Sequence, residues 1–223
     1  MEVQILTRES FEEQLITLKS ELMELGDLAK FALDQSIQAL ENQNVDLALQ
    51  VIDEDAKINL LEEEIDEHAT WLIAKEQPLA SDLRKNIAVM KVTTDIERIG
   101  DLAVNIAKSV IRIGKSEFIE PLNKIPKMAL MAQEMIDCIL KAFNEEDIYQ
   151  AREIAEKDDE VDKMYGGLVA ELMELMTKNP TYVAQIIQLS FICRYLERVA
   201  DHATNISEAI IYLVKGKRYD LNK

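Results

Sequence analysis

The stretch that decides the fold is "DIERIGDLAVNIA", residues 95–107. It returns 100 residues later (195 − 95 = 100) as "YLERVADHATNIS", residues 195–207. Six positions are identical in the two copies, which share the pattern E-R-x-x-D-x-A-x-N-I. An internal repeat of about half the chain length predicts two similar structural units.

The composition favours long helices. The 223 residues include six glycines and four prolines, too few for the frequent turns of a strand-rich fold. Around both copies of the repeat, apolar residues recur at alternating spacings of four and three, which predicts a helix with one apolar seam. The seam residues are Val92, Ile96, Ile99, Ala103, Ile106, Val110 and Ile113 in the first copy, and Ile192, Leu196, Val199, Ala203, Ile206, Ile210 and Leu213 in the second.

Capping and breaking residues divide the chain into six helices. A capping box at Ser10 and Glu13 predicts a first helix that ends near residue 42, and Asn44 is expected to cap a second. Ser81 is expected to cap a third that ends at Gly114. After a linker with two prolines, helices are expected at about 123–143, 145–177 and 180–215, the last opened by an Asn-Pro pair at 179–180 and closed by glycine 216.

These helices predict an all-α fold of two tandem antiparallel three-helix bundles. Short turns between consecutive helices make the up-down-up arrangement the economical packing. The expected domains are residues 1–115 and 116–223.

The two acids of the repeat fall on one face of their helix. Glu97 and Asp101 are one turn apart, as are Glu197 and Asp201, and about 100° per residue turns both pairs away from the apolar seam. We therefore expect them on an outer face. A solvated surface is the ordinary explanation for such acids, but like charges at this spacing cost a few tenths of a kcal/mol, roughly, in an isolated helix.

The preceding helix of each unit carries polar residues at a matching height. The midpoints between these residues and the repeat acids fall on proline 78 and on the Asn-Pro turn at 179–180, so antiparallel helices joined there bring the groups level. Converging oxygen ligands predict a site for Mg, Mn, Fe or Zn ions in each half. The candidate metal ligands are Asp55, Asn59, Glu97 and Asp101 in the first half, and Asp158, Asp162, Glu197 and Asp201 in the second; Glu62, Glu63 and Asp66 lie near the first set.

Charge and apolar content limit the partners. The formal net charge of −17 excludes nucleic acid and disfavours direct adsorption to anionic lipid, while it suits cations and basic protein partners. The longest apolar stretch is too short and too polar to span a bilayer, and the first residues do not form a signal peptide. Cys138 and Cys193 are expected to be reduced core thiols, which indicates a cytoplasmic protein.

Catalytic patterns are missing from the sequence. It has no P-loop, no glycine-rich loop and no nucleophile–histidine pattern. Neither His68 nor His202 has an acid three residues before it, as ferritin-like di-iron bundles require. His202 is expected at the edge of the core with a hydrogen-bond partner, and His68 as a phosphate-accepting histidine is a minor alternative.

The repeated E-R-I-G-D-x-A-x-N-I-A motif and the six-helix count resemble the PhoU family over essentially the whole chain. The resemblance implies a non-enzymatic cytoplasmic regulator that represses the phosphate regulon when phosphate is plentiful. It implies partners in the phosphate ABC transporter and its sensor histidine kinase, with recruitment to the membrane only through them. It also implies E(D)-x-x-x-D motifs that bind iron or zinc clusters; Asn59 departs from that motif, and Leu102 stands where a histidine often follows it.

The sequence leaves the metal, the oligomeric state and the function open to alternatives. The metal is expected to be divalent or trivalent, with manganese and magnesium as alternatives to iron and zinc, and we expect a homodimer. A helical metal-binding or scaffold protein outside phosphate control is the alternative function, and a histidine phosphotransfer bundle is a third.

Overall fold

The computed structural model describes residues 2–115, 119 and 124–221, with side chains from residue 11 onward. This part of the chain contains helices and no strand, which confirms the all-α prediction. The helices are α1 (Glu2–Glu41), α2 (Val45–Glu76), α3 (Ser81–Ile113), α4 (Lys124–Glu145), α5 (Ile148–Lys178) and α6 (Val183–Lys215), with a short 3₁₀ turn at Pro180–Tyr182.

Polar side chains and glycines set several helix ends. Asn44 accepts a hydrogen bond from the backbone N–H of Leu47 at 3.0 Å, so it caps α2 as predicted. Asp147 does the same for α5. Gly114 and Gly216 follow α3 and α6 with φ of 65° and 66°, a region that favours glycine.

Three predicted helix starts are wrong in detail. Residue 10 lies inside α1, which begins at Glu2, because the sequence before Ser10 holds no proline or glycine to stop the helix. Ser81 is the first residue of α3 and Ala80 is its cap residue, without a side-chain hydrogen bond. Asn179 is a cap residue followed by Pro180 as predicted, but they open the 3₁₀ turn that precedes α6, and the Asn179 side chain makes no capping bond.

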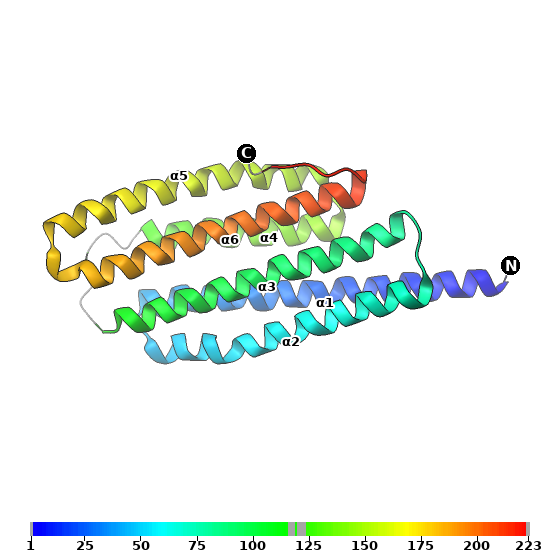
Figure 1. Cartoon of the computed structure of the whole chain (residues 1–223), viewed down its shortest axis with the longest axis horizontal. Coiled ribbons are helices and arrows are strands. Elements are labelled where there is room, and N and C mark those ends of the chain that lie inside the picture. The colour runs from blue at the N-terminus through cyan, green and yellow to red at the C-terminus, as the bar shows by residue number, and fades with distance from the viewer. Residues whose placement is uncertain (1, 116–118, 120–123, 222–223) are drawn as a thin grey trace.

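The six helices run along the long axis of the molecule as two three-helix units (Figure 1). In the first unit α3 packs against α1 and α2, and in the second α6 packs against α4 and α5. The units meet mainly through α3 and α6, which lie antiparallel in the middle, and α1 also touches α4 (Figure 1). At Gly26 of α1 an added Cβ would lie 2.6 Å from Leu140 Cδ1 of α4, so only glycine permits this approach between units without a shift.

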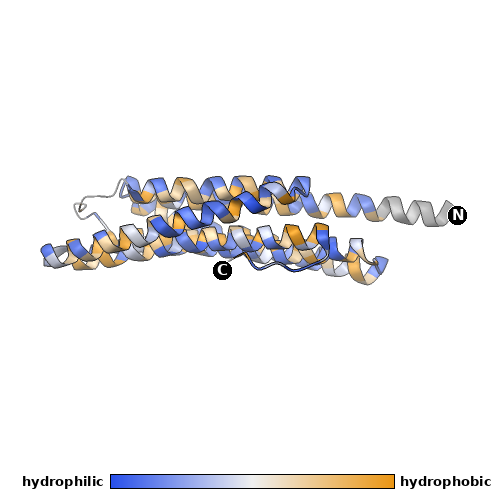
Figure 2. Ribbon diagram, turned by 90° about the horizontal axis from the view of Figure 1, so that it is seen from above, coloured by the Kyte–Doolittle hydropathy of each residue, from blue (hydrophilic) through white to orange (hydrophobic). Residues whose placement is uncertain are grey.

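The core follows the predicted seams. Every residue of both seams is buried, which confirms how α3 and α6 are turned. Each helix carries hydrophobic and hydrophilic residues along its length, as amphipathic helices do (Figure 2). None of the described helices has an apolar run long enough to cross a membrane.

Candidate metal sites

Acids interrupt the core-facing stripes of α2 and α5. In α5 the buried residues are Ala151, Ile154, Asp158, Val161, Leu168 and Leu172, so Asp158 occupies a place that the spacing reserves for an apolar residue. In α2 the buried residues Val51 and Ile58 leave a gap in the same spacing, which Asp55 fills. The helices therefore turn Asp55 towards α3 and Asp158 towards α6.

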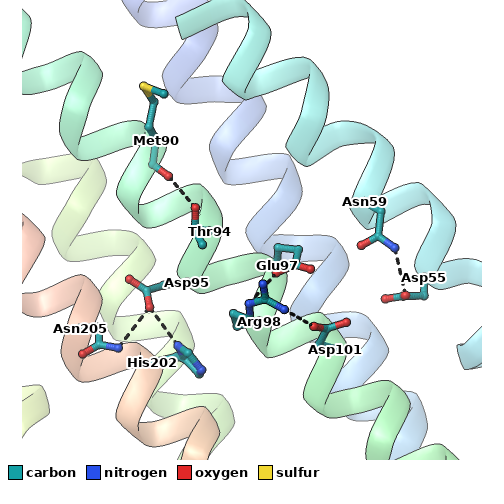
Figure 3. A network of polar contacts seen from close by, with 10 residues as sticks. All are labelled: Asp55, Asn59, Met90, Thr94, Asp95, Glu97, Arg98, Asp101, His202 and Asn205. Atoms are coloured by element: carbon teal, nitrogen blue, oxygen red, sulfur yellow. Dashed lines mark hydrogen bonds and ion pairs between the residues drawn. The ribbon is translucent and has the colours of Figure 1, made fainter. Parts of the chain in front are cut away.

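In the first half, the acids of α3 face a hydrogen-bonded pair on α2 (Figure 3). Asn59 Nδ2 donates to Asp55 Oδ2 at 3.2 Å. The guanidinium of Arg98 lies 3.3 Å from Glu97 Oε2 through Nε and donates to Asp101 Oδ2 at 2.8 Å through Nη1 (Figure 3). One exposed arginine thus neutralises part of the charge of both repeat acids.

Close helix packing brings the two pairs together. Gly100 of α3 lies so near α2 that an added Cβ would be 3.0 Å from Ile58 Cδ1 and 3.8 Å from Asp55 Oδ1. Burial, followed by the negative charge of Asp101, raises the pKa of Asp55. Burial and the charges of Asp101, Glu62 and Asp55 raise the pKa of Glu97 despite Arg98. The predicted juxtaposition of these acids across α2 and α3 is therefore present, with Glu62 as a further member.

The second half is more enclosed. Asp158 and Glu197 are 9% and 8% exposed, and Arg194 donates to Glu197 Oε1. The other carboxylate oxygen of Glu197, Oε2, and Asp158 Oδ1 are buried without a hydrogen-bond partner. A buried charged oxygen without a partner is costly, so these two atoms mark a place where a cation would stabilise the protein.

The environment favours the neutral form of Asp158, Glu197 and Asp201. Burial, then the charges of Asp201 and Asp162, raises the pKa of Asp158 to about 6. Burial, then the charge of Asp201, raises the pKa of Glu197 to about 7, although the ion pair with Arg194 opposes the shift. Burial and Asp162 also raise the pKa of Asp201. All four predicted ligands of this half thus lie within electrostatic reach of one another.

The metal-free protein is expected to lose stability as pH rises between about 4 and 7. The folded pKa values of Asp158 and Glu197, about 6 and about 7, lie above the ordinary values of 3.8 and 4.5. In this window the folded chain therefore binds more protons than the unfolded chain. A rise in pH favours the state with fewer bound protons, so the free energy of unfolding falls. Urea unfolding at several pH values, with a chelator present, measures the trend.

Glu197→Gln should flatten this pH dependence, because the amide cannot ionise. Glu64→Gln is a matched control, since Glu64 is exposed on α2. A free energy of unfolding that rises from pH 5 to pH 8, or equal slopes in all three proteins, would contradict the burial of these acids.

One predicted feature of the acids is wrong. The repeat acids lie off the apolar seams of α3 and α6 as expected, but Glu197 is not on an open outer face, and Asp158 lies in the core-facing stripe of α5. The neighbouring helix covers them, because α5 and α6 pack closely against each other. Asp101 and Asp201 are half-buried, and Asp162 is exposed.

The arginines at the acids were not predicted as members of the sites. Arg98 belongs to the repeat motif itself, yet in the second half Glu197 pairs with Arg194, while the charge of Arg198, the counterpart of Arg98, acts against the raised pKa of Asp201. The spacing carries a signal, since positions three apart on a helix face each other and Arg194 precedes Glu197 by three. Residue 94, at the corresponding place in the first half, is a threonine whose hydroxyl donates to the Met90 carbonyl at 3.2 Å (Figure 3).

The ligand set suits a hard or borderline metal ion, but the side chains do not yet surround one. Carboxylate and amide oxygens favour ions such as Mg, Mn, Fe and Zn. Across the described residues, no three His, Cys, Asp or Glu side chains are grouped closely enough to hold an ion as they stand. Three ligand oxygens are buried without a partner: Asp55 Oδ1 in the first half, and Asp158 Oδ1 and Glu197 Oε2 in the second. They fit a metal, which would have to draw the other carboxylates inward against their mutual repulsion.

The two histidines make their hydrogen bonds to acids outside these ligand sets, although the charge of His202 also acts on Asp201. His202 Nδ1 is 2.9 Å from Asp95 Oδ1, and Asn205 Nδ2 donates to the same oxygen at 3.2 Å (Figure 3). This contact links α6 to α3 and confirms a hydrogen-bonded histidine at the core edge. His68 lies 2.8 Å from Glu21 Oε2 through its Nδ1 atom.

Comparisons with known proteins converge on one family. A family model of the PhoU domain matches residues 22–110 and 125–210. The chain is 37% identical to the phosphate-specific transport system accessory protein PhoU homolog of Clostridium acetobutylicum, over 97% of this chain and 100% of that protein. It is 33% identical to the Escherichia coli protein PhoU, over 94% and 87%.

Solved structures show the same relationship. The phosphate transport system regulatory protein PhoU of Streptococcus pneumoniae superposes with a TM-score of 0.88 at 30% identity, over 94% of this chain and 99% of that one. PhoU of Pseudomonas aeruginosa gives a TM-score of 0.89 at 34% identity, over 93% and 100%. The resemblance seen in the repeat motif is therefore confirmed over nearly the whole chain.

Proposed function

Since the chain belongs to the PhoU family, we propose that it is a cytoplasmic negative regulator of phosphate uptake and of the phosphate regulon. It links the phosphate ABC transporter to its sensor histidine kinase and binds divalent metal through its carboxylate clusters. The names of its relatives, accessory and regulatory proteins of phosphate transport systems, support the setting. The observation that carries the metal part is the acid cluster of the second half, in which two buried carboxylate oxygens have no hydrogen-bond partner.

Regulation through protein contact suits this sequence better than turnover of a substrate. The sequence has no motif for a nucleophile or a phosphate-binding loop, so we propose that it is not an enzyme. Its charge of −17 speeds encounter with basic cytoplasmic patches of membrane proteins. Association with these partners is therefore expected to weaken as the salt concentration rises. We further propose a homodimer.

Each half holds its own metal in this proposal. In the second half Asp158, Asp162, Glu197 and Asp201 supply the oxygens, and the first half uses Asp55, Asn59, Glu97 and Asp101. Iron or zinc is proposed first, and manganese or magnesium as alternatives. A bound cation would offset the repulsion that raises the pKa values of Glu197 and Asp158, and would turn an acidic patch into one that accepts a partner's carboxylates.

Elemental analysis and titration with Fe²⁺, Zn²⁺, Mn²⁺ and Mg²⁺ test the metal sites. We expect saturable binding that falls at least about tenfold in affinity, or disappears, in the double variant Asp101→Ala plus Asp201→Ala, because each change removes a central oxygen ligand. A control variant, Glu64→Ala plus Glu153→Ala, removes two exposed acids from the opposite faces of α2 and α5 and should bind as the wild type does. Binding unaffected by the first variant would refute these sites.

A further inference from the structure

A pocket lies at the end of the bundle where the two units meet, away from the carboxylate clusters. It has a volume of about 280 Å³ and is lined by residues of α1, α3 and α6 and of the end of α4. In Figure 1 this is the right-hand end, where α3 begins and where α4 and α6 end. Lys85, which lines the pocket, precedes Glu97 on α3 by 12 residues (97 − 85 = 12), roughly 18 Å along the helix. Ligand pockets start at roughly 300 Å³, so this one has room for a small organic molecule.

The inner wall of the pocket is apolar. Val89 of α3, Phe143 of α4 and Leu213 of α6 line it, and all three belong to the buried core. Ile16 of α1 also lines the pocket and is 69% exposed. An apolar group in the pocket would lie against these core residues and would cover Ile16, and removal of such surface from water is favourable. The pocket therefore suits a ligand with an apolar part.

Two lysines lie among these apolar residues. Lys19 donates to the backbone carbonyl of Asn144 at 2.5 Å and lies 4.0 Å from Glu146 Oε1. An ammonium group has three donors, so Lys19 keeps at least one for a ligand. Burial lowers the pKa of Lys19 against the charge of Glu146, and the charge of Lys85 adds to the decrease. Lys85 is partly buried and makes no hydrogen bond or ion pair with a described side chain, so an anion between the two ammonium groups would stabilise both.

Two acids also line the pocket, but they lie at its rim. Glu12 and Glu146 are exposed, whereas both lysines are partly buried. Exposed charges are screened by water and salt, and partly buried charges are screened less. Arg84 adds a cation beside Lys85, since an added Cβ at Gly216 would lie 3.4 Å from its Nη1 atom. The inner part of the pocket therefore favours a negative group, although the net charge of −17 repels anions at long range.

The corresponding place in the second half is occupied by the chain itself. By the repeat offset of 100, Gln185 stands at the place of Lys85. The backbone N–H of Ile119, in the linker between the units, donates to Gln185 Oε1 at 2.9 Å, and the Ile119 side chain packs against the core. The linker thus brings a hydrogen-bond donor with an apolar group beside it. Lysine has donors and no acceptor, so an occupant at Lys85 must bring an acceptor instead, again with an apolar group.

We propose that this pocket binds a small amphipathic anion, a molecule with one carboxylate or phosphate group on a compact apolar body. The negative group pairs with Lys85 and with the remaining donor of Lys19, and the body lies against Phe143 and Ile16. The apolar body is needed because the net charge of −17 disfavours a bare anion. A ligand held between α1 and α3 of one unit and α4 and α6 of the other stabilises their packing. The inference is independent of the proposed function, since this binding needs neither a metal nor a partner protein.

Titration with matched probes tests the pocket. Octanoate and octyl phosphate carry the same apolar body with the two kinds of negative group. The compound 1-octanol carries the body without the charge, and inorganic phosphate carries the charge without the body. Calorimetry on protein freed of metal should show saturable binding of octanoate or octyl phosphate, at least about tenfold tighter than that of 1-octanol or inorganic phosphate. The tighter of the two anions identifies the negative group that the pocket prefers.

Variants of the pocket locate the binding. Lys85→Gln removes the charge and should weaken binding of the preferred anion by about tenfold, as loss of a charge-assisted hydrogen bond does. Ile16→Ser removes apolar surface at an exposed position and should weaken the binding by about threefold or more. Lys91→Gln is the matched control, because Lys91 is an exposed lysine on the same helix. It should change the affinity less than about twofold.

The outcomes decide both the site and its ligand class. Failure of both amphipathic anions to bind overturns the site, and so does binding that Lys85→Gln leaves unchanged while its melting temperature equals that of the wild type. If Lys85→Gln lowers the melting temperature, unchanged binding to the Ile16→Ser variant overturns the site. Inorganic phosphate that binds as tightly as octyl phosphate, or 1-octanol that binds as tightly as octanoate, overturns the ligand class. These measurements involve no transporter, kinase or metal, so failure of the site leaves the proposed function in place.

Discussion

Ile206→Ala is expected to lower the free energy of unfolding by about 2–5 kcal/mol. Ile206 is fully buried in the apolar seam of α6, so its loss removes apolar contacts and leaves a cavity that close-packed helices fill only in part. Ile99→Ala in the apolar seam of α3 should lower the free energy of unfolding by a similar amount, because Ile99 is also fully buried. Urea unfolding at neutral pH, with a chelator present, measures both.

The comparison needs variants on other faces of the same helices. Arg198→Ala on the exposed side of α6 should change stability within about 0.5 kcal/mol. Glu197→Gln should leave the metal-free protein as stable as the wild type or more stable at pH 8, since it removes a buried carboxylate beside Asp201 and Asp158. The opposite ranking, with Glu197→Gln the more damaging change, would mean that α6 is turned differently.

The seams could be predicted from the sequence because helical periodicity is a local property. A spacing of four and three fixes which side of a helix is apolar before any partner is known. The same holds for ends set by one side chain or one glycine, and Asn44 and Gly216 are found where they were expected. Ser10 shows the limit of this reasoning, because a good capping residue is not used when nothing before it stops the helix.

The acid pairs could also be predicted, since two antiparallel helices joined at a known turn have a fixed register. Proline 78 and proline 180 marked those turns well enough to set Asp55 opposite Asp101 and Asp158 opposite Asp201. Burial could not be predicted in this way. It depends on how closely two helices approach, and that distance is set by small residues such as Gly100, whose missing side chain admits Ile58.

Which arginine forms the ion pair with the acids of each half could not be predicted from the repeat. Both copies carry arginine directly after the glutamate, but Arg98 pairs with the acids of its half whereas Glu197 pairs with Arg194. Side chains this long reach several acids at similar cost, so local packing decides, and here the ring of Tyr165 lies under Arg194. A threonine at position 94 removes that option from the first half.

Deletion of the gene is expected to switch on the phosphate-starvation genes in phosphate-rich medium. The effect should be large, because deletion removes every contact of the protein at once. A repressor that acts through contact removes all of its inhibition when it is absent, whereas a phosphate-consuming enzyme would change expression only through the phosphate pool. A reporter driven by a starvation promoter, measured together with intracellular phosphate, distinguishes the two. Unchanged reporter activity in the deletion strain would remove the regulatory function.

Complementation of the deletion strain then decides whether metal belongs to the mechanism. The double variant Asp101→Ala plus Asp201→Ala should fold, because both residues are only half-buried and lie off the seams, but it should bind metal poorly and fail to restore repression. Glu64→Ala plus Glu153→Ala, with its two exposed acids removed elsewhere, should restore repression fully. Full repression by a folded, metal-free double variant would show that the bound cation is dispensable. Contact with the partner proteins would then cause repression without the charge reversal that a metal supplies.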